Sequence, residues 1–150
     1  MNIKIFKETL DELQDKLCNI LGVEKLEIIR KEIKEDAILD LINNQIIISN
    51  KYIDDIVESK KALIHEMRHQ YQLYCIALDI KEEKMRKMWA FELKYDEPIF
   101  KSEYRNLLFI EIDAYAFTKI YMKKEYDFNV KYSNKYEKII KDYLKNDLKY

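Results

Sequence analysis

Residues 62–72 read ALIHEMRHQYQ and contain the only two histidines of the chain, His65 and His69. On an α-helix, residues four positions apart point the same way, one turn from each other. The three residues before His65 are apolar, so a helix here is expected to be buried, and a buried imidazole needs a partner. Two imidazoles at this spacing can grip one metal ion, with Glu66 beside it. The stretch therefore predicts a metal site on a buried helix, in preference to two histidines that only hydrogen-bond to their neighbours.

The spacing H-E-x-x-H carries a specific chemistry. Zinc lowers the pKa of a water that it binds toward ~7, and a carboxylate at the position of Glu66 can take the proton. By chance, the motif should occur in roughly one protein of this length in a few hundred. Arg68 is unusual, because zinc-peptidase helices mostly carry uncharged residues inside the motif. It points about 60° away from His65 on the helix, and we expect it to skirt the site or to reach solvent.

A third ligand is needed, since catalytic zinc sites usually have three protein ligands and a water. A thiolate ligand could come only from Cys18 or Cys75, and Cys75 is a poor candidate because it lies on the far side of the helix, about 9 Å along it. Glu111 and Asp113, in FIEIDAYAFT at 109–118, are better candidates, because a buried carboxylate is costly unless it is paired or on a metal. They differ by about 200° of helix rotation and cannot both face one site. The periodicity leaves the choice between them open.

The composition limits the classes of function. The chain has 150 residues, 48% of them hydrophobic and 37% charged, which fits one globular domain. Its net charge of -1 argues against nucleic acid or an anionic membrane as the main partner. No apolar run reaches the ~20 residues that span a bilayer, and the N-terminus has no secretory signal. We therefore expect a cytoplasmic protein.

The order of predicted elements indicates an α+β fold. A single glycine and a single proline favour long helices. Apolar spacing predicts an N-terminal helix over 6–21, which Gly22 ends. The other expected elements are a strand within 23–33, a β-hairpin of 37–42 and 45–49 with a two-residue turn at Asn43 and Asn44, a helix that begins between 50 and 59 and runs to about 78, and helices over 81–95, 103–124 and 133–148. Glu97 and Pro98 are expected to end the helix over 81–95.

The motif HEMRH, followed after tens of residues by a helix of the form E-x-[DE]-A-x-x-F, resembles the gluzincin metallopeptidases. Within them, the chain is most similar to small, single-domain members such as the ImmA/IrrE-like proteins, over roughly 37–121. The resemblance implies a zincin-like fold in one domain and a zinc cofactor. Carried over residue by residue, it implies zinc ligands at His65, His69 and Glu111, a general base at Glu66, and Asp113 as the fallback for the third ligand.

The resemblance also raises expectations about substrate binding. In zincins, a strand at the sheet edge pairs with the substrate backbone, and 45–49 is the candidate strand here, with an ordinary core strand as the alternative. Many relatives orient a ligating histidine with an acidic residue four positions after the glutamate ligand, where this chain has Tyr115. An oxyanion partner is required as well, and the sequence does not choose among Tyr104, Tyr115, Tyr132 and Arg105.

Three interpretations follow from these patterns. The leading one is a zinc-dependent metallopeptidase that hydrolyses a protein or peptide substrate. The second is a regulatory or protein-interaction module that keeps the zincin-like fold and the zinc ion but cuts nothing. The third is a helical interaction protein with an accidental motif. The sequence does not indicate the cleavage preference or the oligomeric state.

Overall fold

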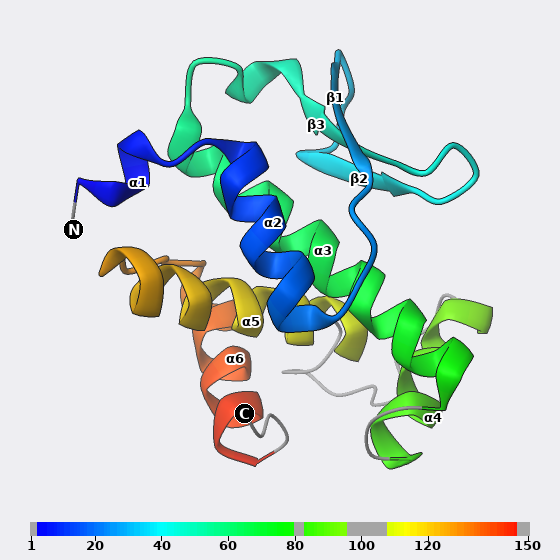
Figure 1. The fold of residues 1–150 in the computed structure, drawn as a ribbon. Coiled ribbons are helices and arrows are strands. Elements are labelled where there is room, and N and C mark those ends of the chain that lie inside the picture. Colours follow the sequence, from blue (N-terminus) through cyan, green and yellow to red (C-terminus); the bar gives the residue numbers. More distant parts are fainter. Residues whose placement is uncertain (1–2, 80–82, 96–107, 147–150) are drawn as a thin grey trace.

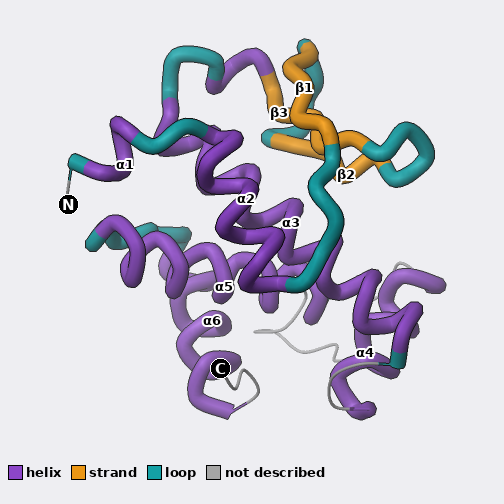
Figure 2. Tube along the Cα trace, viewed as in Figure 1, coloured by secondary structure: helices purple, strands orange, loops and turns teal. Residues whose placement is uncertain are grey.

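The computed structural model describes residues 3–79, 83–95 and 108–146. The fold is mixed α+β, as the sequence predicted, and mostly helical with one small three-stranded sheet (Figures 1 and 2). The elements are α1 (Lys4–Lys7), α2 (Leu10–Leu21), β1 (Glu27–Lys31), β2 (Ala37–Asp40), β3 (Gln45–Ser49), the 3-10 helix η1 (Asn50–Tyr52), α3 (Ile56–Leu78), α4 (Glu83–Tyr95), α5 (Phe109–Tyr126) and α6 (Asn134–Asn146).

Helix α3 carries the HEMRH stretch and is the centre of the fold. It lies between the sheet and α5, and it also contacts α1, α2 and α4 (Figure 1). Two buried apolar clusters flank it. One surrounds Leu63 and Met67, under α2 and the sheet, and the other surrounds Cys75, where α4 and α6 pack with the first half of α5. Because α3 packs against neighbours along its length, its histidines are held in a rigid frame.

The sheet order is β1-β3-β2, so β3 is the central strand. It runs parallel to β1 and antiparallel to β2. The expectation that 45–49 forms the sheet edge is therefore wrong. The alternative, an ordinary core strand, is confirmed, because β3 pairs with β1 on one side and with β2 on the other, and Ile46, Ile47 and Ile48 are all buried. The free edge beside α3 belongs to β2.

One helix and one turn in the first third of the chain differ from the prediction. The helix expected over 6–21 is two helices, because Thr9 begins α2 with a capping box that it shares with Glu12. The hairpin loop has four residues, 41–44, and only Asn44 has a positive φ, 53°. Asn43 donates instead to the side chain of Asp40, which widens the turn.

The other element predictions are confirmed within the described residues. Gly22 ends α2 at φ 66°, and α3, α4 and α6 lie where the periodicity placed them. The predicted residues 103–107 of the α5 helix lie outside the described residues, as do Glu97 and Pro98. Among the described helices, none combines the length and the apolar character that crossing a membrane requires.

Candidate metal centre

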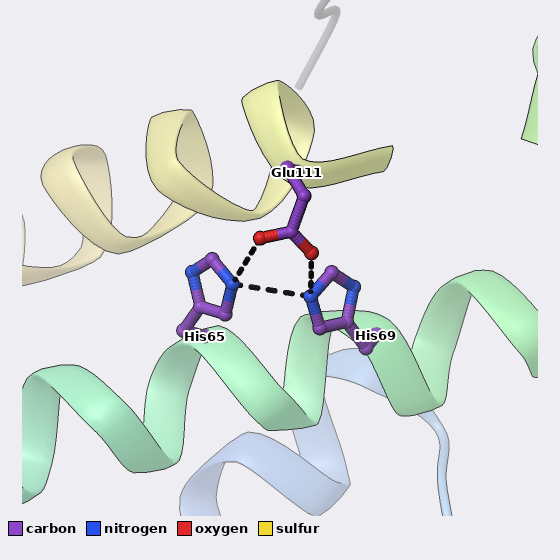
Figure 3. A group of neighbouring side chains, drawn as sticks. All are labelled: His65, His69 and Glu111. Atoms are coloured by element: carbon purple, nitrogen blue, oxygen red, sulfur yellow. Dashed lines mark hydrogen bonds and ion pairs between the residues drawn. The ribbon is translucent and has the colours of Figure 1, made fainter. Parts of the chain in front are cut away.

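Three side chains that the sequence singled out converge between α3 and α5. His65 and His69 rise from one face of α3, and Glu111 reaches toward them from the first turn of α5 (Figure 3). The Nε2 atoms of the two histidines are 3.1 Å apart. The Glu111 carboxylate lies 3.2 Å from Nε2 of His65 and 2.6 Å from Nε2 of His69. Among the described residues, these three form the one group whose donor atoms all lie within 4.8 Å of one another.

The start of α5 is held by a side chain from α4. Leu108, at the N-cap, offers no side-chain cap to the first backbone N–H groups of α5. Glu92 is buried and takes this role, because its carboxylate accepts from the N–H of Phe109 at 2.6 Å and of Ile110 at 2.8 Å. A carboxylate also suits the positive end of the helix dipole. Glu92 thereby fixes the turn that presents Glu111.

The spacing of the donor atoms fits a small tetrahedral ion. Two atoms bound to one zinc ion at ~2.0–2.1 Å lie about 3.3 Å apart when the angle is tetrahedral. The distances in this cluster are 3.1, 3.2 and 2.6 Å, so an ion would widen the first two by about 0.1–0.2 Å and the third by about 0.7 Å. Two imidazoles and one carboxylate suit zinc and other divalent transition metals.

In the metal-free protein, Glu111 and the histidines stabilise each other electrostatically. Burial alone would lower the pKa of His69, but its contact with the Glu111 carboxylate outweighs burial and raises this pKa to about 9. Burial would raise the pKa of Glu111, yet the hydrogen bonds from His65 and His69 hold it well below its usual range. A proton on His69 therefore occupies the place that a metal ion would take.

Glu66 lies beside the cluster in a groove of about 670 Å³, which is also lined by His65, His69 and Glu111. Burial raises the pKa of the Glu66 carboxyl, and the charges of the two histidines partly offset this effect. A carboxylate with a raised pKa next to a metal site has the property that a general base at neutral pH requires. Neither thiol belongs to the cluster, since Cys75 is buried elsewhere and Cys18 is half-buried on α2.

The free edge of β2 forms one side of the groove. The N–H of Ser49 donates to the carbonyl of Asp36 at 2.9 Å, which sets the alternation of the antiparallel ladder. Bonded and unbonded pairs alternate, so every second residue of β2 turns its backbone N–H and C=O toward the free edge. These residues are Ala37 and Leu39. In agreement with this, the Leu39 backbone lies close enough to the Glu66 carboxyl to lower its pKa slightly.

Asp113 faces away from the cluster, so Glu111 and Asp113 point to different neighbours, as their rotation on the helix required. The Asp113 carboxylate accepts from Arg68 Nε at 2.7 Å and from a second guanidinium nitrogen at 3.0 Å. It also accepts from the Tyr143 hydroxyl at 2.6 Å. The expectation for Arg68 was wrong. The Arg68 side chain lies neither at the border of the site nor in solvent, but is buried in this ion pair with Asp113. A guanidinium at this depth requires a carboxylate opposite it.

Sequence reasoning missed Gln72, which contacts His69 directly. Its Oε1 lies 2.8 Å from Nδ1 of His69, and its Nε2 donates to Asp113. A polar residue three positions after a ligand candidate, on the same buried helix face, was the available signal. Tyr115 packs its ring against His65, with centroids 4.7 Å apart. Both Tyr115 and Tyr132 line the groove. Tyr104 and Arg105 lie outside the described residues.

Comparison of the chain with protein families, with curated proteins and with solved structures gives no significant match. The functional argument therefore depends on the geometry of the site and on the motifs themselves.

Proposed function

We propose that this protein is a zinc-dependent metallopeptidase with a zincin-like arrangement of its site. One observation carries the proposal. The donor atoms of His65, His69 and Glu111 meet in a groove that also holds Glu66 and the free edge of a β-strand. An accidental pair of histidines would not require a carboxylate from a second helix between them, and Glu111 is the residue that the resemblance to gluzincins assigns as the third ligand.

Each element of the site has a role in peptide hydrolysis. A zinc ion held by the three ligands would polarise a peptide carbonyl and acidify a water molecule. Glu66 accepts a proton from the attacking water and passes it to the leaving amine, a role that its raised pKa supports. His65, His69 and Glu111 supply two neutral donors and one charge, the ligand set common in catalytic zinc sites.

The groove also offers a means to hold the substrate. An extended peptide can add to the free edge of β2 by main-chain hydrogen bonds, using the outward N–H and C=O groups of Ala37. The equivalent groups of Leu39 lie next to Glu66, so a peptide paired along this edge has its backbone beside the general base. This arrangement favours a protein or peptide substrate.

A second function is a non-catalytic, zinc-binding regulatory or protein-interaction module. Tyr115 favours it, because an aromatic ring packs on His65 at the position where gluzincins often place a carboxylate that orients a ligand. A phenol is a weaker acceptor than a carboxylate, and a ring contact provides no charge to raise the basicity of the ligand. The two functions share the metal and differ in hydrolysis.

Metal analysis and cleavage of a broad peptide library test the proposal together. We expect close to one zinc ion per chain, lost in His65→Ala, and cleavage that a chelator abolishes. Glu66→Gln keeps the size of the side chain and removes the base, so it should bind zinc normally and lose roughly 10²–10⁴-fold in rate. Glu125→Gln, the same substitution in an ion pair with Lys4, is the matched control.

The outcomes separate the interpretations. Protein that binds no zinc, even when zinc is supplied, would mean that the cluster is not a zinc site. A zinc-loaded protein that cuts nothing in the library would favour the regulatory module. Equal cleavage by the parent and by Glu66→Gln would assign the activity to a contaminant or to another site.

A further inference from the structure

Gln72 is buried within α3, three residues after His69, and its amide makes three short contacts. Its Nε2 lies 2.9 Å from the carbonyl oxygen of Ile110 and 2.7 Å from Oδ2 of Asp113. Its Oε1 lies 2.8 Å from Nδ1 of His69. The side chain therefore joins the buried ion pair to one of the candidate metal ligands.

The chemistry of the partners determines which way the amide faces. A backbone carbonyl can only accept, and a carboxylate that receives two hydrogen bonds from Arg68 is ionised and accepts as well. The NH₂ group of Gln72 must therefore face Ile110 and Asp113. A flipped amide would oppose its oxygen to two acceptors and lose both hydrogen bonds in a buried position, where unpaired polar groups are costly.

It follows that the oxygen of Gln72 faces His69 and that Nδ1 of His69 must donate. A neutral imidazole carries one proton, so a proton on Nδ1 leaves the lone pair on Nε2. Nε2 is the atom that lies 3.1 Å from its counterpart on His65 and next to Glu111. The lone pair thereby points to the centre of the cluster.

We infer that Gln72 is a positioning residue that selects the metal-binding tautomer of His69 and fixes the orientation of its ring. Asp113, held by Arg68 and Tyr143, fixes Gln72 in turn. His65 has no such support, since within the described part of the chain its Nδ1 has no hydrogen-bond partner and its ring packs on Tyr115. This inference rests on the proposed metal site and adds how one ligand is prepared for it.

Zinc affinity of a Gln72→Met variant provides the first test. Methionine matches the length of glutamine and cannot hydrogen-bond to His69, so we expect zinc to dissociate about 10–100-fold more readily. The matched control is Gln14→Met, which removes another buried glutamine whose Nε2 donates to a backbone carbonyl, that of Leu26 at 2.7 Å. It should lower the unfolding temperature of the metal-free protein by a comparable amount and leave zinc affinity as in the parent. A folded Gln72→Met protein that binds zinc as tightly as the parent would overturn the inference.

The second test uses the unsubstituted protein without metal, so it does not depend on the folding of a variant. The chain has only two histidines, and ¹⁵N-labelled imidazoles can be assigned with one histidine variant. Whatever the state of Nε2, Nδ1 should carry a proton that donates to the buried Gln72 and exchanges slowly with solvent. An Nδ1 without a proton, or an Nδ1 proton that exchanges as fast as one exposed to water, would refute the inference. Protein that binds no zinc but shows the Nδ1–H form would refute the proposed function and support the role of Gln72.

Discussion

Replacing Arg68 with methionine tests the structural reasoning at its most buried point. Only 4% of the Arg68 side chain and none of the Asp113 side chain is exposed, and the two are joined by hydrogen bonds of 2.7 and 3.0 Å. The guanidinium also lies 4.6 Å from the ring centroid of Tyr71 and 4.8 Å from that of Phe117. Methionine keeps much of the apolar contact but removes the charge. The variant therefore isolates the cost of a buried carboxylate without its cation.

The size of the effect follows from this geometry. Removing one partner of a buried ion pair costs about 3–5 kcal/mol, because the remaining charge has lost both its partner and its water. Gln72 and Tyr143 still donate to Asp113, which limits the loss to this range. For a chain of this length each kcal/mol corresponds to ~2–4 °C, so the unfolding temperature should fall by roughly 6–20 °C.

Thermal and urea unfolding of the metal-free protein, followed by circular dichroism, measures the loss. Arg86→Met is the matched control, since Arg86 pairs with the largely exposed Asp79 and such pairs contribute about 0–1 kcal/mol. The double variant Arg68→Met/Asp113→Asn removes the stranded charge and should recover part of the stability, which gives a coupling energy. If Arg68→Met unfolds within about 1 kcal/mol of the parent, the pair is not buried and ionised as described, and the support of Gln72 by Asp113 is wrong too.

Two further predictions concern the pH and the start of α5. The pKa of His69 is raised from 6.5 to about 9 in the metal-free protein, so zinc must displace its proton. Zinc affinity should therefore rise about tenfold per pH unit from pH 7 to 9. Calorimetry in buffers of different ionisation enthalpy should detect about one proton released for each zinc ion bound. The same shift stabilises the metal-free fold below pH 6.5, and this contribution is lost as the pH rises through about 9. Glu92→Ala should lower the free energy of unfolding by about 1–3 kcal/mol, because it leaves the N–H groups of Phe109 and Ile110 unpaired. It should also weaken zinc binding more than this loss of stability alone explains. Unchanged zinc affinity would show that Glu92 does not position Glu111.

Much of the fold could be predicted from local patterns. The helices follow apolar spacing of 3.6 residues, and Gly22 ends α2 because the left-handed conformation there suits a residue without a side chain. The order of the strands could not be predicted in this way. The residues of β3 pair with β1 and with β2, and the parallel pairing with β1 depends on a crossover that no local pattern encodes. The edge strand was misassigned for this reason.

The candidate site was predictable where its residues share one helix. His65, Glu66 and His69 are neighbours on α3, so their relation follows from helix geometry alone. The choice between Glu111 and Asp113 needed the rotation of α5 about its own axis. That rotation is set by packing against α3 and α6 and by the cap from Glu92, which are contacts between distant parts of the chain.

Arg68 and Asp113 show why such contacts matter for interpreting the site. Taken separately, a charged residue inside HEMRH is unusual for a zinc peptidase, and a second carboxylate near Glu111 leaves the third ligand open. They are 45 residues apart in the chain, and in the structure each is the partner that the other requires. Because the carboxylate is then held in place, Gln72 can bridge from it to His69 and orient that imidazole indirectly. Arg68 and Asp113 thus support one candidate ligand, whereas Tyr115 leaves the other with only ring packing. On this reasoning, loss of orientation should affect the two histidines unequally, with His69 dependent on Gln72 and His65 dependent on its aromatic neighbour.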